Sequence, residues 1–401
     1  MIRTTSDLRT LHIGAVIFLG LAVTIPLRSQ IAKPGYDDRL LFKGATGAVI
    51  GGTVQQWTLN DTGTFFQFSA PFSVSVPVGN RMLLSVTNSG MSSSSDRADV
   101  AGIVDTRVGL SYVLPGDRIW LTAGASIPTG TTELDEANGE LDLSKYITQP
   151  AFAFRTPVFG QGFSGNAGVA YAAPLTRRLV FGLGTSFFYR GEYRPVKSSG
   201  DSGAVAFDYD PGDEVSVNMG IDYITYSKAA RVSFDLTATY FFDDRLNGAT
   251  VFRSGPRFSL FGVYALRTGE FSHALNARLR YRLQNAYITA GTETKYDAAV
   301  QGEAQYTLTR PLTDWLVGTG SVELKYYTPD QVPFGGSIVK TGDATVVSVG
   351  ADLLLLVSDI VTPTVTLRYA AGTSTIADGA FNEVSYDVTG LEAGVGLKVS
   401  F

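Results

Sequence analysis

Residues 391–401 end the sequence with the stretch LEAGVGLKVSF, in which apolar residues alternate with polar or small ones. The apolar positions are Leu391, Ala393, Val395, Leu397, Val399 and Phe401. A period of two predicts a β-strand, because successive side chains of a strand point to opposite faces. All the apolar side chains then share one face, and both charged residues, Glu392 and Lys398, share the other.

The same alternation recurs along the chain, for example in residues 213–227, 230–244 and 270–284. In each stretch one face is apolar and the other carries Arg, Asp, Glu, Asn, Thr, Ser or Gly, which would make a costly protein core. Aromatic residues also gather near the strand ends, as they do at membrane interfaces. A closed barrel with lipid outside and a polar lumen accounts for both features. The chain is therefore predicted to be all-β, a transmembrane antiparallel up-and-down β-barrel.

Sixteen strands are expected, or fourteen if the Gly-rich first pair forms a plug in the lumen. They are residues 48–59, 64–78, 81–89, 105–114, 118–128, 164–174, 179–190, 214–226, 230–242, 256–267, 270–283, 295–308, 315–327, 344–357, 361–371 and 391–401. Tight turns alternate with long connections, which predicts periplasmic turns at one end. The long connections, including residues 130–163, are expected to face outward.

The composition excludes several classes of function. The 401 residues contain no Cys, so disulfides, thiolate metal sites and Cys nucleophiles are absent. A net charge of -5 gives no basic footprint for nucleic acid. One of the two histidines, His12, lies in the N-terminal leader, and the other, His273, has the lipid-facing parity near the periplasmic rim. We expect neither an enzyme nor a cofactor.

The N-terminus indicates the compartment. Arg3 and Arg9 precede an apolar stretch from Ile13 to Pro26, which is typical of a secretory signal. We expect a signal peptide in residues 1–29, with a retained anchor helix as the alternative. Residues 30–47 then form a periplasmic or plug segment, and residues 48–401 form the barrel in the bacterial outer membrane.

The inward-facing parity identifies candidate ligand contacts. Arg278, Arg280 and Arg282 occupy alternate positions of one strand, where they could bind a carboxylate or set an anion preference. The alternative is a structural ladder in which Asp297 pairs with Arg282. Trp120 and Phe188 have the same parity and could contact a ring-bearing substrate, although packing within the lumen explains them equally well.

A second charged pair is predicted from strand register. The turn from Ser358 to Ile360 places Asp352 opposite Thr366, with Arg368 as its diagonal neighbour. We therefore expect an ion pair between Asp352 and Arg368. Acidic loops lack the spacing of a calcium loop, so no metal site is expected, although they could share divalent cations with lipopolysaccharide.

Two stretches resemble known outer-membrane proteins. The terminal Phe401 on an alternating strand resembles the C-terminal assembly signal that the barrel-insertion machinery reads. Residues 64–130, with a tight turn and a strand that ends in Pro128, Thr129 and Gly130, resemble the long-chain fatty-acid transporters and the related barrels of phenol meta-cleavage pathways. The resemblance implies passive uptake of a small hydrophobic or aromatic compound, with carboxylated compounds included. The alternative is a structural or secretion-accessory barrel that scaffolds partner proteins; outer-membrane lipid and lipopolysaccharide surround either.

Overall fold

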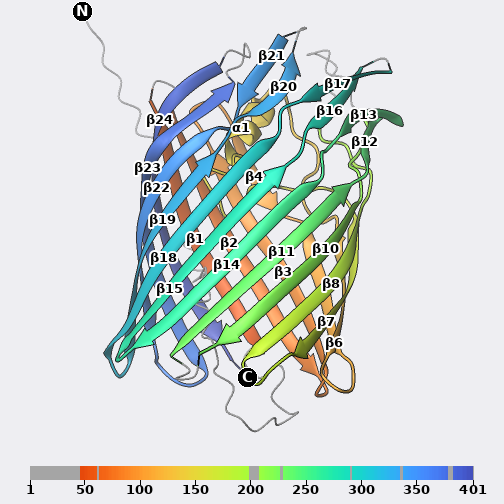
Figure 1. Cartoon of the computed structure of the whole chain (residues 1–401). Helices are drawn as coiled ribbons and strands as arrows, with labels where there is room; N and C mark the ends of the chain where they lie inside the picture. Colours follow the sequence, from red (N-terminus) through yellow and green to blue (C-terminus); the bar gives the residue numbers. More distant parts are fainter. Residues whose placement is uncertain are drawn as a thin grey trace, which may run out of the picture.

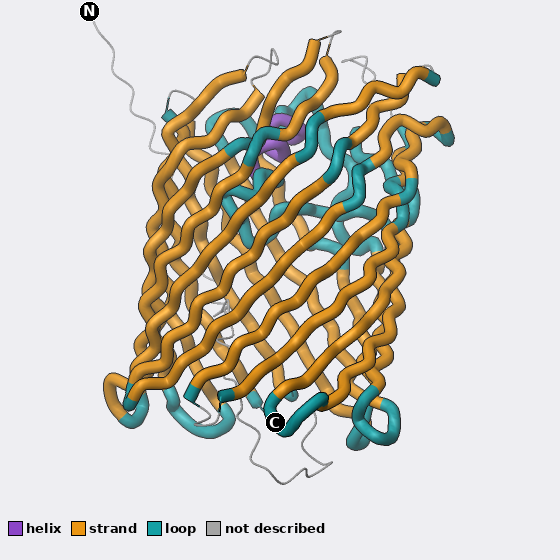
Figure 2. Tube along the Cα trace, in the orientation of Figure 1, coloured by secondary structure: helices purple, strands orange, loops and turns teal. Residues whose placement is uncertain are grey.

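The computed structural model describes residues 46–60, 63–197, 207–225, 229–289, 291–334, 337–377 and 383–400. These residues form one closed antiparallel barrel with a small helix inside it and further strands above one rim (Figures 1 and 2). The expected signal peptide, residues 1–29, lies outside the described residues, and so do Phe401 and residues 30–45 of the expected N-terminal segment 30–47. The last residue of that segment, Gly47, begins the first strand of the wall. In the described part of the chain, no helix is long and apolar enough to cross a membrane.

The wall strands have the following bounds. They are β1 (Gly47–Leu59), β2 (Gly63–Val78), β3 (Met82–Ser94), β4 (Asp99–Ile103), β5 (Thr106–Val113), β6 (Ile119–Ile127), β7 (Ser164–Pro174), β8 (Leu179–Arg190), β10 (Glu214–Ile224), β11 (Ala230–Phe241), β14 (Arg257–Thr268), β15 (Phe271–Arg282), β18 (Ala299–Thr313), β19 (Leu316–Tyr327), β22 (Ala344–Leu355), β23 (Val361–Ala377) and β24 (Glu383–Val399). Because β4 and β5 both pair with β3, one after the other, the 17 strands of the sheet make a sixteen-strand barrel among the described residues.

The barrel closes between its first and last strands. β1 pairs with β2 on one side and with β24 on the other, from Ala48 opposite Val399 to Leu59 opposite Val388. The predicted strand count is confirmed. β1 and β2 are wall strands, so the Gly-rich first pair does not form the plug that was considered as an alternative.

The two faces of the wall follow the predicted parity. On β11, Leu236 is 39% exposed on the apolar outer face, and its partner Met219 on β10 is 48% exposed. The neighbouring Thr237 lies opposite Asn218 on the inner face. On β24, Leu391 and Val395 are exposed on the outer face, whereas Glu392 between them is buried on the inner face. This alternation presents an apolar surface to lipid around a polar lumen.

Short turns join the strands at one end, and longer segments rise above the other (Figure 1). At the long end, a five-stranded sheet continues some of the wall strands upward. Its strands are β9 (Tyr209–Asp210), β12 (Asp243–Leu246), β13 (Ala249–Arg253), β16 (Asn285–Thr289) and β17 (Thr292–Tyr296), and a separate pair is β20 (Asp330–Phe334) with β21 (Ser337–Thr341). The long end is therefore the extracellular side, as in other outer-membrane barrels.

The connection between β6 and β7, residues 128–163, turns into the lumen rather than outward. Its helix α1 (Glu140–Ile147) lies inside the extracellular half of the barrel (Figure 2). The prediction that this segment faces outward was therefore wrong. The reason is apolar burial, because Leu143 and Ile147 of α1 are 2% and 1% exposed against the inner wall. We call residues 128–163 the inward loop.

Candidate functional site

The inward loop is fixed to the wall by two glutamines on adjacent strands. Gln55 on β1 accepts a hydrogen bond from the backbone N–H of Arg155 at 2.6 Å and donates to the carbonyl of Ala153 at 3.1 Å. Gln67 on β2 accepts from the N–H of Thr156 at 2.9 Å and donates to its carbonyl at 2.8 Å. Each side-chain amide thus makes one donated and one accepted hydrogen bond with the loop backbone, as a neighbouring strand would. Without them, these backbone polar groups would be buried without partners.

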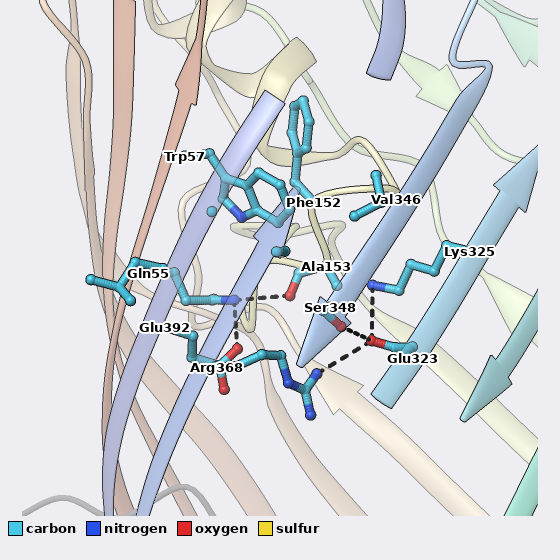
Figure 3. A pocket seen from close by; sticks show the side chains of 13 residues that line it. Gln55, Trp57, Phe152, Ala153, Glu323, Lys325, Val346, Ser348, Arg368 and Glu392 are labelled. Carbon is cyan, nitrogen blue, oxygen red and sulfur yellow. Dashed lines mark hydrogen bonds and ion pairs between the residues drawn. The ribbon is translucent and has the colours of Figure 1, made fainter. Parts of the chain in front are cut away.

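Aromatic side chains also pack the inward loop against β1 and β2. Phe152 of the loop is 1% exposed, and its ring centroid lies 4.9 Å from that of Trp57 on β1 (Figure 3). Tyr146 of α1 stacks on Phe65 of β2 at 4.2 Å. Full burial of an aromatic side chain contributes roughly 1.5–3 kcal/mol relative to exposure. The loop is therefore packed against the inner face of the wall and occupies part of the lumen.

The base of the inward loop is held by one carboxylate. Asp105 accepts hydrogen bonds from the N–H groups of Gly130 at 2.9 Å and Gln161 at 2.8 Å, so it joins the two ends of the loop. A Cβ at Gly130 would lie 2.4 Å from the carbonyl oxygen of Phe159. Only glycine fits there, which gives the Pro-Thr-Gly stretch a structural role at the start of the loop.

A charged network lines the wall beside the loop. Glu323 on β19 accepts from Ser348 at 3.1 Å and lies 3.8 Å from Lys325 and 3.5 Å from Arg368 (Figure 3). Glu392 accepts from Gln55 at 3.1 Å and pairs with Arg155 of the loop. A cavity of about 20 Å³ lies between these charges and the rings of Trp57 and Phe152, which is room for about one water molecule.

The predicted ion pair between Asp352 and Arg368 was wrong, although its register was right. Asp352 lies opposite Thr366 and accepts a hydrogen bond from that hydroxyl at 2.7 Å. Arg368 instead reaches Glu323, two strands away. It can do so because it lies opposite Gly350, where a Cβ would lie 3.5 Å from the Arg368 Nε. The inward-facing glycine leaves room for the guanidinium to cross β22.

The three predicted arginines of β15 all lie on the inner face and all have acidic partners. Arg278 and Arg280 each lie 3.6 Å from Glu303 on β18. Arg282 pairs with Asp330 of β20. The expected partner of Arg282 was wrong, since Asp297 hydrogen-bonds Gln331 instead, at 2.7 Å. The three arginines of β15 thus form structural ion pairs, and their guanidiniums also line the lumen.

Arginines on two other strands extend this surface. Arg190 on β8 pairs with Glu214 and lies over the ring of Phe188, with 5.5 Å from Cζ to the ring centroid. Arg257 on β14 lies over Phe241 at 5.0 Å, and Arg278 lies over Phe261 at 5.6 Å. We call the five side chains Arg190, Arg257, Arg278, Arg280 and Arg282 the arginine wall. Sequence analysis missed Arg190 and Arg257, which an inward-parity count on β8 and β14 would have found.

The two predicted aromatic contacts are on the inner face but not together. Phe188 lies opposite Asn166 and Glu214, within the arginine wall. Trp120 is 40% exposed and lies opposite Ala170 near the periplasmic end of β6. Ala170 pairs with a β8 residue four positions from Phe188, which is roughly 13 Å along the strand.

The wall from β5 to β8 is lined by small residues. Inward positions there include Gly109, Gly124, Gly168, Gly182 and Gly184. A Cβ at Gly124 would lie 2.3 Å from Asn166 Oδ1, and a Cβ at Gly109, Gly168 or Gly184 would also lie under 3 Å from a side-chain oxygen of a neighbouring strand. The inward loop packs on other strands of the wall, β1 to β4, β19 and β22 to β24. The side of the wall that the described part of the inward loop does not contact therefore carries the small residues of β5 to β8 and the arginine wall.

The extracellular sheet is held by charged and phenolic groups. Burial raises the pKa of Tyr209, and its hydroxyl donates to Asp244 at 2.5 Å, which raises it further. The hydrogen bond from Arg253, at 2.7 Å, lowers the pKa of Asp243. These contacts stiffen the hairpin of β12 and β13 above the rim.

The described residues contain one histidine, His273, which belongs to β15. His273 lies on the outer face near the periplasmic rim, as predicted, and hydrogen-bonds Thr268 at 2.9 Å and the Tyr306 hydroxyl at 2.8 Å. No group of three His, Cys, Asp or Glu residues that could hold a metal ion occurs in the ranges that the structure describes.

These features define a bacterial outer-membrane β-barrel with a polar lumen and an inward-folded constriction loop. Solved structures similar to this chain include a bacterial polysaccharide outer membrane secretin, with 10% identity, a TM-score of 0.43 and coverage of 89% of this chain and 99% of that chain. OprB of Pseudomonas putida gives 12% identity, a TM-score of 0.42 and coverages of 88% and 93%. The CymD monoaromatic hydrocarbon channel gives 11% identity, a TM-score of 0.38 and coverage of 89% of each chain. At sequence identities this low, the similarity shows the barrel fold alone. No protein-family model and no curated protein sequence matches the chain.

Proposed function

We propose that the protein is a channel for passive diffusion of small hydrophobic or aromatic compounds, including carboxylated ones, across the outer membrane. The observation that carries the proposal is the division of the lumen. The inward loop packs on one side through Gln55, Gln67 and Phe152, and the opposite side is lined by glycines and arginines. A barrel that served only as a scaffold would need no such asymmetry.

The lumen surface favours amphipathic solutes. Arginine guanidiniums stacked on rings are flat cations that pair with carboxylates and also pack on aromatic faces. Phe188 and Trp120 add apolar surface at two heights of the same lumen. A small aromatic acid could use both kinds of surface during passage, whereas a neutral sugar would lack the negative charge that pairs with the guanidiniums.

Liposome swelling tests the proposal. Proteoliposomes that contain the refolded barrel should swell in neutral solutes at rates that fall with solute size. At equal concentration, benzoate should enter faster than glycerate, which has the same charge, is smaller and has no ring. Swelling no faster than in protein-free liposomes for every solute would favour the scaffold. Swelling without preference for benzoate would keep the channel and refute the substrate class.

A further inference from the structure

Arg257 differs from the other members of the arginine wall. Arg190, Arg278, Arg280 and Arg282 pair with three carboxylates, which belong to Glu214, Glu303 and Asp330. Within the described part of the chain, the Arg257 guanidinium has no acidic partner and no side-chain hydrogen bond, and its contact is the ring of Phe241. None of its nitrogen atoms is fully buried without a partner, so its donors face the lumen.

The neighbours of Arg257 make this arrangement costly. Arg257 lies directly opposite Arg282 on the same face of the wall and diagonal to Arg280, which lies opposite Ser259. Like charges at directly opposed positions destabilise a sheet. The positive charges of Arg280, Arg190 and Arg282 all repel the guanidinium of Arg257. An anion in the lumen would relieve this repulsion, because it would supply the charge that the wall lacks.

We propose that Arg257 is the centre of an oxyanion-binding site in the lumen, assisted by Arg280, and that it holds the carboxylate of a permeating compound. Stacking on Phe241 fixes the plane of the Arg257 guanidinium. A fixed guanidinium binds a carboxylate or phosphate through two parallel hydrogen bonds at little entropic cost. Arg280 is the fitting second donor, because its own contacts are long, at 3.6 Å to Glu303 and 3.3 Å to Gln301.

The site deepens the proposed function and rests on it only for the route by which the ligand arrives. Carboxylates and inorganic phosphate share the oxyanion chemistry that Arg257 recognises. Neutral aromatic compounds do not. The site thus predicts a distinction between benzoate and benzyl alcohol, which share a phenyl ring and differ in charge.

Calorimetric titration of the refolded barrel in detergent tests the site without requiring conduction. At constant ionic strength, benzoate should bind the native chain, and Arg257→Gln should weaken binding at least 10-fold. Arg257→Lys, which keeps the charge and loses the planar fork, should weaken it several-fold. Parallel titrations with inorganic phosphate and benzyl alcohol identify the ligand class, and binding of either oxyanion with the same loss in Arg257→Gln supports the site.

Arg267→Gln is the matched control. Arg267 lies on the same strand and has the same inward parity near the periplasmic end, so its substitution makes the same change in lumen charge. It should change the affinity for benzoate less than about 2-fold. Equal weakening by Arg267→Gln, an unchanged affinity in Arg257→Gln, or equal binding of benzyl alcohol would overturn the proposal. Failure of the channel would appear separately, as absence of swelling with this binding intact.

Discussion

Phe152→Ala is expected to release the inward loop from the wall. The side chain is 1% exposed and packs between Trp57 and Phe154, with ring centroids 4.9 Å and 6.4 Å away. Truncation of a buried Phe to Ala costs about 3–5 kcal/mol. Since each 1.4 kcal/mol is a factor of ten, the population of the undocked loop should rise on the order of 10²–10⁴-fold.

Limited trypsin digestion of the folded barrel measures this population. Lys145 and Arg155 are the cleavage sites within the loop that docking protects, and cleavage through a fast local opening follows the open population. Phe163→Ala is the control, because Phe163 belongs to the same loop and is 50% exposed. If Phe152→Ala is cut no faster than Phe163→Ala, the loop is not held by this packing and the description of the constriction is wrong.

Three further predictions concern the wall, the extracellular sheet and the C-terminus. Urea unfolding should give a coupling of about 0.5–3 kcal/mol between Arg368→Ala and Glu323→Gln, whereas Arg368→Ala and Asp352→Asn should be additive; the reverse would restore the pair predicted from register alone. The pKa of Asp243 is lowered because Arg253 donates hydrogen bonds to it, so its contribution to the stability of the β12–β13 hairpin is full above its ordinary pKa of about 3.9 and is lost as pH falls through the lower folded value. A spin label at the tip of this hairpin should therefore gain mobility only below about pH 4, and Asp243→Asn should remove that transition. Deletion of Phe401 should reduce the membrane yield, measured by heat-modifiable mobility on gels, and a normal yield would remove its role as an assembly signal.

The barrel was predictable because a strand has a side-chain period of two. Once Leu236 and Leu391 face lipid, every other residue of their strands is assigned by parity, and the turns fix the register. The register of Asp352 opposite Thr366 followed in this way. The partner of Arg368 could not be predicted from register, because a long side chain can cross a strand wherever that strand presents a glycine.

The inward loop was missed because its length and polar residues are typical of an extracellular loop. Two signals in the sequence could have indicated it. The segment 151–159 contains three phenylalanines, which an exposed loop would leave in water. Gln55 and Gln67 occupy inward positions on adjacent strands, and a long amide at such a position can bind a passing backbone. The partner of Arg282 was also unpredictable, since Asp330 reaches it from a strand above the rim.

Single-channel recording with cysteine variants tests most directly that solutes pass through the lumen beside the arginine wall. The chain contains no Cys, so Arg278→Cys and Leu279→Cys each introduce one thiol, on the inner and the outer face of the same strand. A charged, water-soluble methanethiosulfonate reagent should reduce the conductance of Arg278→Cys and leave that of Leu279→Cys unchanged. Absence of conductance in the native barrel, or an equal response of the two variants, would contradict the account.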